Sequence, residues 1–267
     1  GPPGDPSIGQ EIADEEHGRP PSAPDRVAAV KAGNHQERDW ERWDGEGVAA
    51  TIESYWQGSA HEHAHRDTLA ELCALYLTDP GLDVLEVGCG TGMIYQRLVP
   101  RLIANERYTG VDVSEEMLAI GRRKFPRARL LAGDGYALRF ADRSFDTVLC
   151  FEVLGHLPEI GTLLREMVRV ARKTVIFTIW PAADGVVETR ESVRGERFLH
   201  RQYSHAYLYE QIQRALPDVA IEMEVGILHA EHWAYVLHRR EGPGGLAFTR
   251  LFPVPGYQRR LAEASQR

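Results

Sequence analysis

Cysteine is scarce in this sequence, and its few cysteines form no recognisable site. The 267 residues include three, Cys73, Cys89 and Cys150, which are too far apart for a Cys-x-x-Cys metal pair. Their odd number excludes a complete disulfide framework of the kind that stabilises small secreted proteins. We therefore expect reduced thiols and a cytoplasmic protein.

Long apolar runs and an excess of positive charge are also lacking. No stretch approaches the roughly 20 apolar residues of a membrane-spanning helix, and no secretory signal pattern is visible. The chain carries 31 Lys and Arg against 39 Asp and Glu, a formal net charge of -8. This balance argues against a surface for nucleic acids or anionic membranes, so we expect neither as a partner.

Lysine is rare among the basic residues. Only Lys31, Lys124 and Lys173 are lysines, and arginine supplies the rest. Such a preference is typical of bacterial genomes rich in G and C, and it suggests a bacterial protein.

The remaining composition, 43% hydrophobic and 26% charged residues, is ordinary for a globular protein with one large core and a small additional cap. Residues 1–24 are rich in Pro, Gly, Asp and Glu and lack apolar periodicity, which predicts a disordered leader. Helical spacing of apolar residues from about 25 to 77 predicts a helical N-terminal cap over 25–79.

Short apolar runs alternate with helical patterns along the middle of the chain. Runs that predict strands begin at residue 83 and recur at 108–113, 129–132, 145–151 and 174–180, and a final antiparallel pair follows at 219–228 and 232–238. Strands that alternate with helices predict a parallel sheet, because right-handed crossovers place helices on both faces. We predict an α/β fold with a doubly wound, mostly parallel seven-stranded sheet, an antiparallel last strand, and a Rossmann-like domain over 80–240.

Two segments interrupt this alternation. Residues 181–203 lack clear periodicity, and a long loop in a compact domain is often functional, so we expect a substrate-binding insertion at about 181–205. Residues 204–216 return to a helical pattern. Residues 241–267 predict an appended C-terminal arm with an amphipathic end.

The central motif is VLEVGCGTG at residues 84–92. An apolar strand runs into three glycines at alternate positions, and a helical pattern follows. Glycine permits a tight turn and lets the backbone approach a ligand without a Cβ in the way. The N-terminal amides of the next helix point at the same place. The spacing differs from the G-x-G-x-x-G of dinucleotide-binding proteins.

This motif resembles the first motif of class I S-adenosylmethionine-dependent methyltransferases, in which the loop wraps the amino-acid and ribose parts of the cofactor. The resemblance implies S-adenosylmethionine as cofactor and methyl donor. It also implies that Glu86, Gly88, Cys89 and Gly90 bind it.

An acidic residue stands at the end of the second predicted strand. Asp112 lies 20 residues after Gly92, in a stretch similar to the family's second motif. One carboxylate suits two adjacent hydroxyl donors, so Asp112 would bind the ribose, with Val113 and Met117 beside it. The alternative is an aspartate that only caps the following helix.

Further motifs follow the third predicted strand. The resemblance implies that Asp134 accepts from the adenine amino group and that the backbone amide of Gly135 faces the adenine ring. The stretch 138–148 resembles another family motif, with Arg139 in place of the usual proline. We interpret its Asp146 as structural.

The segment after the fourth predicted strand is where the family brings the reactive sulfonium to the acceptor. Cys150 and Phe151 would contact the cofactor there. His156 would bind the acceptor or deprotonate it, since a histidine pKa lies near neutral pH; the alternative is a histidine that only packs the loop. Some relatives carry a Glu-x-x-Glu-His metal site here, but this sequence has Glu152 and His156 with Gly155 between them. We therefore expect no metal.

Aromatic and basic residues outside these motifs are candidates for the rest of the site. Arg66 lies where relatives bind the cofactor's carboxylate, and chance surface placement is the alternative. Tyr55 and Trp56 would form a lid, because aromatic faces stabilise a sulfonium cation; a buried pair that holds the cap is the alternative. We assign Tyr55 and Arg66 to cofactor binding. The predicted substrate-binding residues are Trp56, His156, Trp180, His200 and Tyr203.

His61, His63 and His65 form a second cluster, near Asp67. On a helix, His61 and His65 share one face at a spacing that suits a metal ion. Surface or substrate-facing histidines are the alternative, which we favour.

The motifs, in the family's order, span residues 83–180, and the flanking segments are not covered. We predict an enzyme that transfers a methyl group from S-adenosylmethionine to an oxygen or nitrogen of a small-molecule acceptor, such as a bacterial specialised metabolite. The alternatives are a peptide or protein acceptor, or a cofactor-binding protein of this fold without methyl transfer. Both a monomer and a homodimer remain open.

Overall fold

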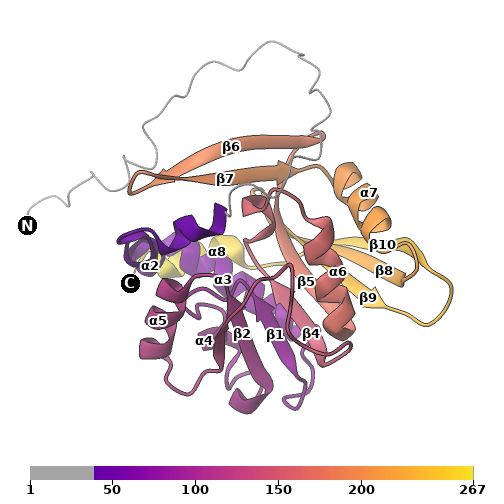
Figure 1. The fold of residues 1–267 in the computed structure, drawn as a ribbon, viewed down its shortest axis with the longest axis horizontal. Helices are drawn as coiled ribbons and strands as arrows, with labels where there is room; N and C mark the ends of the chain where they lie inside the picture. The colour runs from indigo at the N-terminus through magenta and orange to yellow at the C-terminus, as the bar shows by residue number, and fades with distance from the viewer. Residues whose placement is uncertain (1–38, 267) are drawn as a thin grey trace, which may run out of the picture.

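The computed structural model describes residues 39–266, which fold around a central β sheet with helices on both faces (Figure 1). The strands are β1 (Val84–Val87), β2 (Tyr108–Asp112), β3 (Leu130–Ala132), β4 (Phe145–Cys150), β5 (Ala171–Pro181), β6 (Val186–Val193), β7 (Glu196–Tyr203), β8 (Ala220–His229), β9 (His232–Arg239) and β10 (Gly245–Pro253). The helices are η1 (Asp39–Asp44), α2 (Val48–Gly58), α3 (Ala60–Ala74), α4 (Tyr95–Leu98), η2 (Asn105–Arg107), α5 (Glu115–Lys124), η3 (Leu154–His156), α6 (Gly161–Val170), α7 (His205–Ala215) and α8 (Tyr257–Ala264).

The strand order is β10-β8-β9-β5-β4-β1-β2-β3, and β7 joins the sheet through β5. The strands from β3 to β5 pair in parallel, whereas β9 is antiparallel to both β5 and β8. The mostly parallel sheet with an antiparallel strand at 232–239 is therefore confirmed. The number of strands is not: the sheet has ten, because β6, β7 and β10 escape prediction.

The segment expected to be an irregular insertion is a β hairpin. β6 and β7 pair antiparallel from Val186 opposite Tyr203 to Val193 opposite Glu196. Every residue of β6 is at least partly exposed, so no apolar alternation marks it as a strand. β10, in the expected C-terminal arm, is likewise mostly exposed and pairs in parallel with β8. Backbone pairing with a neighbouring strand forms both elements without a buried face.

Alternate residues of the central strands enter two different cores. On β5, Val175 and Phe177 pack with residues of α6 and α7, whereas Ile176 packs with residues of α3, α4 and α5. Burial on both faces explains the nearly continuous apolar runs of these strands. It also leaves the carboxyl ends of the parallel strands, at one edge of the sheet, as the place for a ligand.

The helices before β1 contact both the sheet and the C-terminal helix. α3 packs beside α8, where the Tyr257 hydroxyl lies 2.5 Å from Nδ1 of His61 and Arg260 donates to the Thr68 hydroxyl at 3.2 Å. α2 and α3 thus supply helices within the expected cap. The predicted leader, and the start of the predicted cap up to residue 38, lie outside the described residues. Among the described residues, no helix has the length and apolar character needed to cross a membrane.

Candidate functional site

A cavity of about 470 Å³ lies between the carboxyl ends of the parallel strands, the helices before β1 and the β6–β7 hairpin. All but two of the predicted site residues line it. They are Tyr55, Trp56, Arg66, Glu86, Gly88, Cys89, Gly90, Asp112, Val113, Met117, Asp134, Gly135, Phe151, His156, Trp180 and His200.

Cys150 and Tyr203 are the two that do not line the cavity. The Cys150 side chain is fully buried in the core beneath α6. Tyr203 is also buried, and its hydroxyl donates a 2.9 Å hydrogen bond to the Leu154 carbonyl, at the start of η3. Its contact therefore supports the turn that carries His156 rather than the cavity wall.

The glycine turn after β1 is held against β2 by its own backbone. The amides of Gly88 and Cys89 both donate to the Val111 carbonyl, at 2.8 and 3.1 Å. Gly88 has φ 76°, and a Cβ there would lie 2.2 Å from a methyl group of Val153. A side chain at Gly88 is therefore excluded by both conformation and space.

Asp112 ties this turn to the start of α5. One carboxylate oxygen accepts from the Gly90 amide at 2.7 Å, and the other accepts from the Ser114 amide at 2.9 Å. Ser114 itself caps α5, since its hydroxyl accepts from the Met117 amide at 3.1 Å. Burial raises the pKa of Asp112, and the two backbone donors oppose that shift. Asp112 also lines the cavity, so support of the turn and ligand binding are compatible.

Glu86 is the most deeply buried acid of the site. Its carboxylate accepts a short hydrogen bond from the Tyr108 hydroxyl. Burial raises the pKa of Glu86 to about 8, although this hydrogen bond acts in the opposite direction. The carboxyl group is therefore largely protonated at neutral pH in the protein without ligand.

Two carboxylates fix the N-terminal helices over the glycine turn. Asp44 accepts from the Ser114 hydroxyl at 2.6 Å and from the Glu116 amide at 3.2 Å. Glu53 on α2 accepts from the Thr91 hydroxyl and from Lys124, both at 2.5 Å. These contacts bring Trp43, Tyr55 and Trp56 to the cavity wall.

Arg66 lines the cavity, but its guanidinium is already engaged. It binds Glu62 closely, donates to Glu152 at 2.9 Å, and lies 4.9 Å from the ring centre of Trp56. Burial disfavours the charged form of Glu152, but Arg66 and His65 outweigh this effect and hold its pKa well below the usual range. Glu152 has φ 59°, a strained conformation for a residue with a side chain, and its amide donates to the Thr178 hydroxyl at 2.8 Å.

Aromatic rings line the cavity beyond the glycine turn. The ring centres of Trp43 and Phe198 lie 4.5 Å apart, as do those of Trp180 and His200. His156 stands between the two tryptophans, 5.2 Å from Trp43 and 5.3 Å from Trp180. This part of the wall combines apolar faces with imidazole groups.

The His156 ring has a defined hydrogen bond. Its Nδ1 lies 2.7 Å from the Leu199 carbonyl on β7, which can only accept, so Nδ1 carries the proton and Nε2 keeps its lone pair. Burial lowers the pKa of His156, and this hydrogen bond opposes the shift. The neutral ring is therefore the predominant form at neutral pH and is able to accept a proton.

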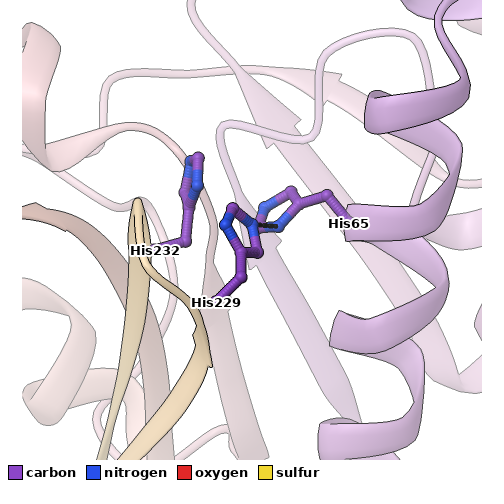
Figure 2. Close-up of side chains that lie close together, drawn as sticks. All are labelled: His65, His229 and His232. Atoms are coloured by element: carbon purple, nitrogen blue, oxygen red, sulfur yellow. Dashed lines mark hydrogen bonds between the residues drawn. The ribbon is translucent and has the colours of Figure 1, made fainter. Parts of the chain in front are cut away.

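The histidines of α3 divide between two environments. His63 faces away from the cavity, with Nε2 3.0 Å from the Gln57 carbonyl. His65 is buried, and its Nδ1 lies 3.1 Å from Nε2 of His229. His232, which lines the cavity, has its ring centre 4.2 Å from that of His65 (Figure 2).

Several residues of the cavity wall were not assigned to the site from the sequence. Trp43, Phe198, Glu152 and His232 line the cavity but belong to none of the predicted site. Phe198 lies on a strand that periodicity does not reveal, and the others meet the cavity only through folding. Glu152 alone had a signal, as a partial match to a metal motif.

The chain is similar in sequence to several known proteins. Residues 84–174 match the family described as a methyltransferase domain. The chain is 34% identical over 142 residues to phosphatidylethanolamine N-methyltransferase of Cereibacter sphaeroides. The aligned region covers 51% of this chain and 62% of that protein. The chain is also 29% identical over 192 residues to a probable S-adenosylmethionine-dependent methyltransferase of Mycolicibacterium smegmatis. This aligned region covers 71% of this chain and 69% of that protein.

A solved structure resembles the fold. Magnesium protoporphyrin IX methyltransferase of Synechocystis PCC 6803 with bound SAH aligns with a TM-score of 0.57 and 17% identity, over 75% of this chain and 98% of that chain. At this identity the similarity concerns the fold alone. The chain spans less than two thirds of the Cereibacter relative's length.

Replacing Glu86 by glutamine is expected to change how stability depends on pH. The ordinary glutamate pKa is 4.5 and the folded value is about 8, so the folded state keeps a proton that the unfolded state releases. The stability that this group contributes is fully present below 4.5 and is lost as pH rises through about 8. Glu86→Gln should therefore gain stability relative to the wild type as pH rises, which urea unfolding of the ligand-free proteins at several pH values measures.

Glu115→Gln is a matched control for Glu86→Gln, because this glutamate is exposed on α5. Its unfolding curves should keep the pH dependence of the wild type. A difference between Glu86→Gln and the wild type that stays constant with pH would contradict the assigned protonation.

Proposed function

We propose that the protein is a class I S-adenosylmethionine-dependent methyltransferase and that it transfers a methyl group from S-adenosylmethionine to an oxygen or nitrogen of a small-molecule acceptor. The match of residues 84–174 to a methyltransferase domain supports this proposal. The observation that carries this proposal is the continuity of one cavity. The glycine turn, Asp112 and Asp134 line one part of it, and Trp43, Trp180 and Phe198 line another.

The cofactor would occupy the part of the cavity beside β1, β2 and β3. The ribose hydroxyls would donate to Asp112, which lines the cavity. Asp134 would accept from the adenine amino group, and the glycine turn would hold the amino-acid part. The side chains of Tyr55 and Trp56 at the wall would limit access of water to the sulfonium.

The acceptor would lie in the aromatic part of the cavity. The size of the cavity suits a small molecule rather than a folded protein, and its aromatic walls favour a planar or apolar acceptor. The acidic balance of the whole chain agrees with such an acceptor, and the arginine preference supports a bacterial metabolite as the substrate class.

The chemistry requires few specialised groups. The acceptor heteroatom attacks the methyl carbon in line with the bond to sulfur, which breaks and leaves its electron pair on sulfur. Alignment of the two molecules at close contact supplies most of the acceleration. The acceptor proton would pass to Nε2 of His156, because Nδ1 is occupied by the Leu199 carbonyl.

Asp112→Ala is expected to weaken the binding of S-adenosylhomocysteine about 10- to 100-fold, because a hydrogen bond to a charged group contributes roughly 1.5–3 kcal/mol. Isothermal titration calorimetry measures the affinity. Asp142→Ala, at an exposed aspartate bound to Arg169, is the matched control and should bind as the wild type does. Wild-type affinity in folded Asp112→Ala would show that this residue does not bind the ribose.

Methyl transfer itself is tested with labelled cofactor. We expect purified protein, incubated with S-adenosylmethionine labelled in its methyl group and with bacterial metabolite pools, to produce a labelled small molecule that mass spectrometry detects. Label recovered in peptides or proteins instead would move the proposal to the macromolecular acceptor. Binding of the cofactor without any labelled product across broad pools would favour a protein that binds it without transfer.

His156→Gln should lower kcat about 10²- to 10⁴-fold with the acceptor found in this way, because the base is lost, and should leave the affinity for S-adenosylhomocysteine unchanged. Protonation removes the base, and burial places the pKa of His156 below 6.5. Wild-type activity should therefore persist to a lower pH than an ordinary histidine would allow. His63→Gln is the control. Full turnover by His156→Gln would exclude His156 as the base.

A further inference from the structure

A group of imidazoles lies at the wall of the cavity that the proposed methyl transfer does not use. Figure 2 shows His65 projecting from α3 toward His229 and His232, which stand at the two ends of the turn between β8 and β9. One ring nitrogen from each of the three lies within 4.8 Å of those from the other two. Two segments that are distant in the chain thus present three imidazoles to one point.

The spacing is close to that of a metal centre. A tetrahedral zinc ion with bonds of about 2.0 Å to nitrogen separates its ligand atoms by roughly 3.4 Å. Nδ1 of His65 and Nε2 of His229 are already 3.1 Å apart. The widest separation has to close by up to about 1.4 Å, which is within the reach of small ring movements.

A carboxylate contacts two of these histidines. Oε1 of Glu152 lies 2.8 Å from Nε2 of His65 and 3.3 Å from Nε2 of His232. Its other oxygen accepts from Arg66 at 2.9 Å, which orients the carboxylate. Glu152 contacts Nε2 of His65, which leaves Nδ1, on the side of His229, for an ion. Three histidines are a donor set typical of zinc and other divalent transition metals, and a carboxylate on the other nitrogen of a ligating imidazole orients that ring.

The polar atoms of this cluster are poorly satisfied by the protein. Nε2 of His65 and both ring nitrogens of His232 are buried and make no hydrogen bond of acceptable geometry with any described residue. Buried polar atoms without a partner are uncommon in folded proteins and require an explanation such as a bound ion. A metal ion would take the lone pair of one nitrogen in each ring and would leave the other nitrogen protonated, as a donor.

The surrounding charges suit a cation. Glu62 and Glu231 line the cavity nearby, in addition to Glu152, whereas Arg66 is the positive group in contact with Glu62 and Glu152. Since His232 lines the cavity, an ion bound to it would be reachable from the space that we assign to the acceptor.

We propose that His65, His229 and His232 bind one divalent transition-metal ion such as Zn²⁺, with Glu152 as a positioning residue that orients the imidazoles. This goes beyond the proposed methyl transfer, and binding of the ion does not depend on it. It differs from the expectation of no metal, which rested on the spacing of Glu152 and His156 along the chain and did not include the β8–β9 turn. In methyl transfer, the ion would hold an acceptor oxygen or nitrogen against the sulfonium, a role that does rest on the proposed function.

The test is zinc binding by the untagged protein after removal of metals with a chelator. We expect calorimetry to give one Zn²⁺ per chain, and Co²⁺ to produce the visible absorption of a site with four ligands. His229→Ala and His232→Ala should each bind Zn²⁺ at least about 100-fold more weakly. Loss of a residue that only orients a ligand already lowers metal affinity by up to about 100-fold, and loss of the ligand itself should lower it at least as much. Glu152→Gln should weaken binding as well.

His63→Ala is the matched control, since it removes an imidazole from the same helix but outside the cluster. It should bind Zn²⁺ as the wild type does. Calorimetry with S-adenosylhomocysteine shows whether each variant is folded, and it separates failure of the metal site from failure of the methyl-transfer proposal. If His229→Ala does not fold, His229→Gln, which keeps the size of the half-buried side chain, replaces it.

Two results would overturn the metal site. One is absence of stoichiometric Zn²⁺ binding by the wild type. The other is Zn²⁺ binding that persists in folded His229→Ala and His232→Ala, or that His63→Ala reduces equally. Either result would leave the cluster as a set of imidazoles around Glu152 that binds no metal ion.

Discussion

The left-handed backbone of the glycine turn is the constraint on which the rest of the site depends. The turn follows β1 and is fixed to β2 by two amides on the Val111 carbonyl, while Asp112 accepts from the Gly90 amide. Because Val153 occupies the space beside Gly88, this conformation excludes any side chain at that position. The same contacts that shape the turn bring the end of β2 and the start of α5 to the cavity.

The cavity exists because two further elements cover this edge of the sheet. Asp44 and Glu53 bind α5 and the glycine turn, and so hold the first helices above it. The β6–β7 hairpin closes another side, with the Leu199 carbonyl fixing the tautomer of His156. The part of the wall that we assign to the cofactor is thus made by the sheet, whereas the part that we assign to the acceptor is made by additions to it. A common fold can in this way serve different acceptors.

Glu152 links the two parts of the wall. It follows β4 in a strained conformation and contacts Arg66, His65 and His232, which come from α3 and from the turn between β8 and β9. A buried carboxylate is unfavourable unless cations or donors surround it, and Arg66 meets this need. Strain combined with buried, incompletely paired polar groups is typical of a functional site rather than of a structural core.

Local patterns in the sequence were enough to predict the helices and strands that leave an apolar run or a periodic spacing of apolar residues. Buried strands reveal themselves by apolar runs, and Asp112 and Asp134 follow such runs at the edge where parallel strands end together. Phe151 and Cys150 show the limit of this reasoning. They are neighbours at the end of one strand, but successive side chains point to opposite sides, and only Phe151 reaches the cavity.

Only the tertiary structure decided what depends on contacts between distant segments. β6 forms by pairing with β7 while its side chains remain at least partly exposed, so no hydrophobic pattern records it. His65 and His229 are 164 positions apart, and no spacing rule connects them. By itself the sequence determined the parallel core and the glycine turn, because burial and backbone conformation leave local patterns. The acceptor wall and the histidine cluster leave none, because they are assembled by folding.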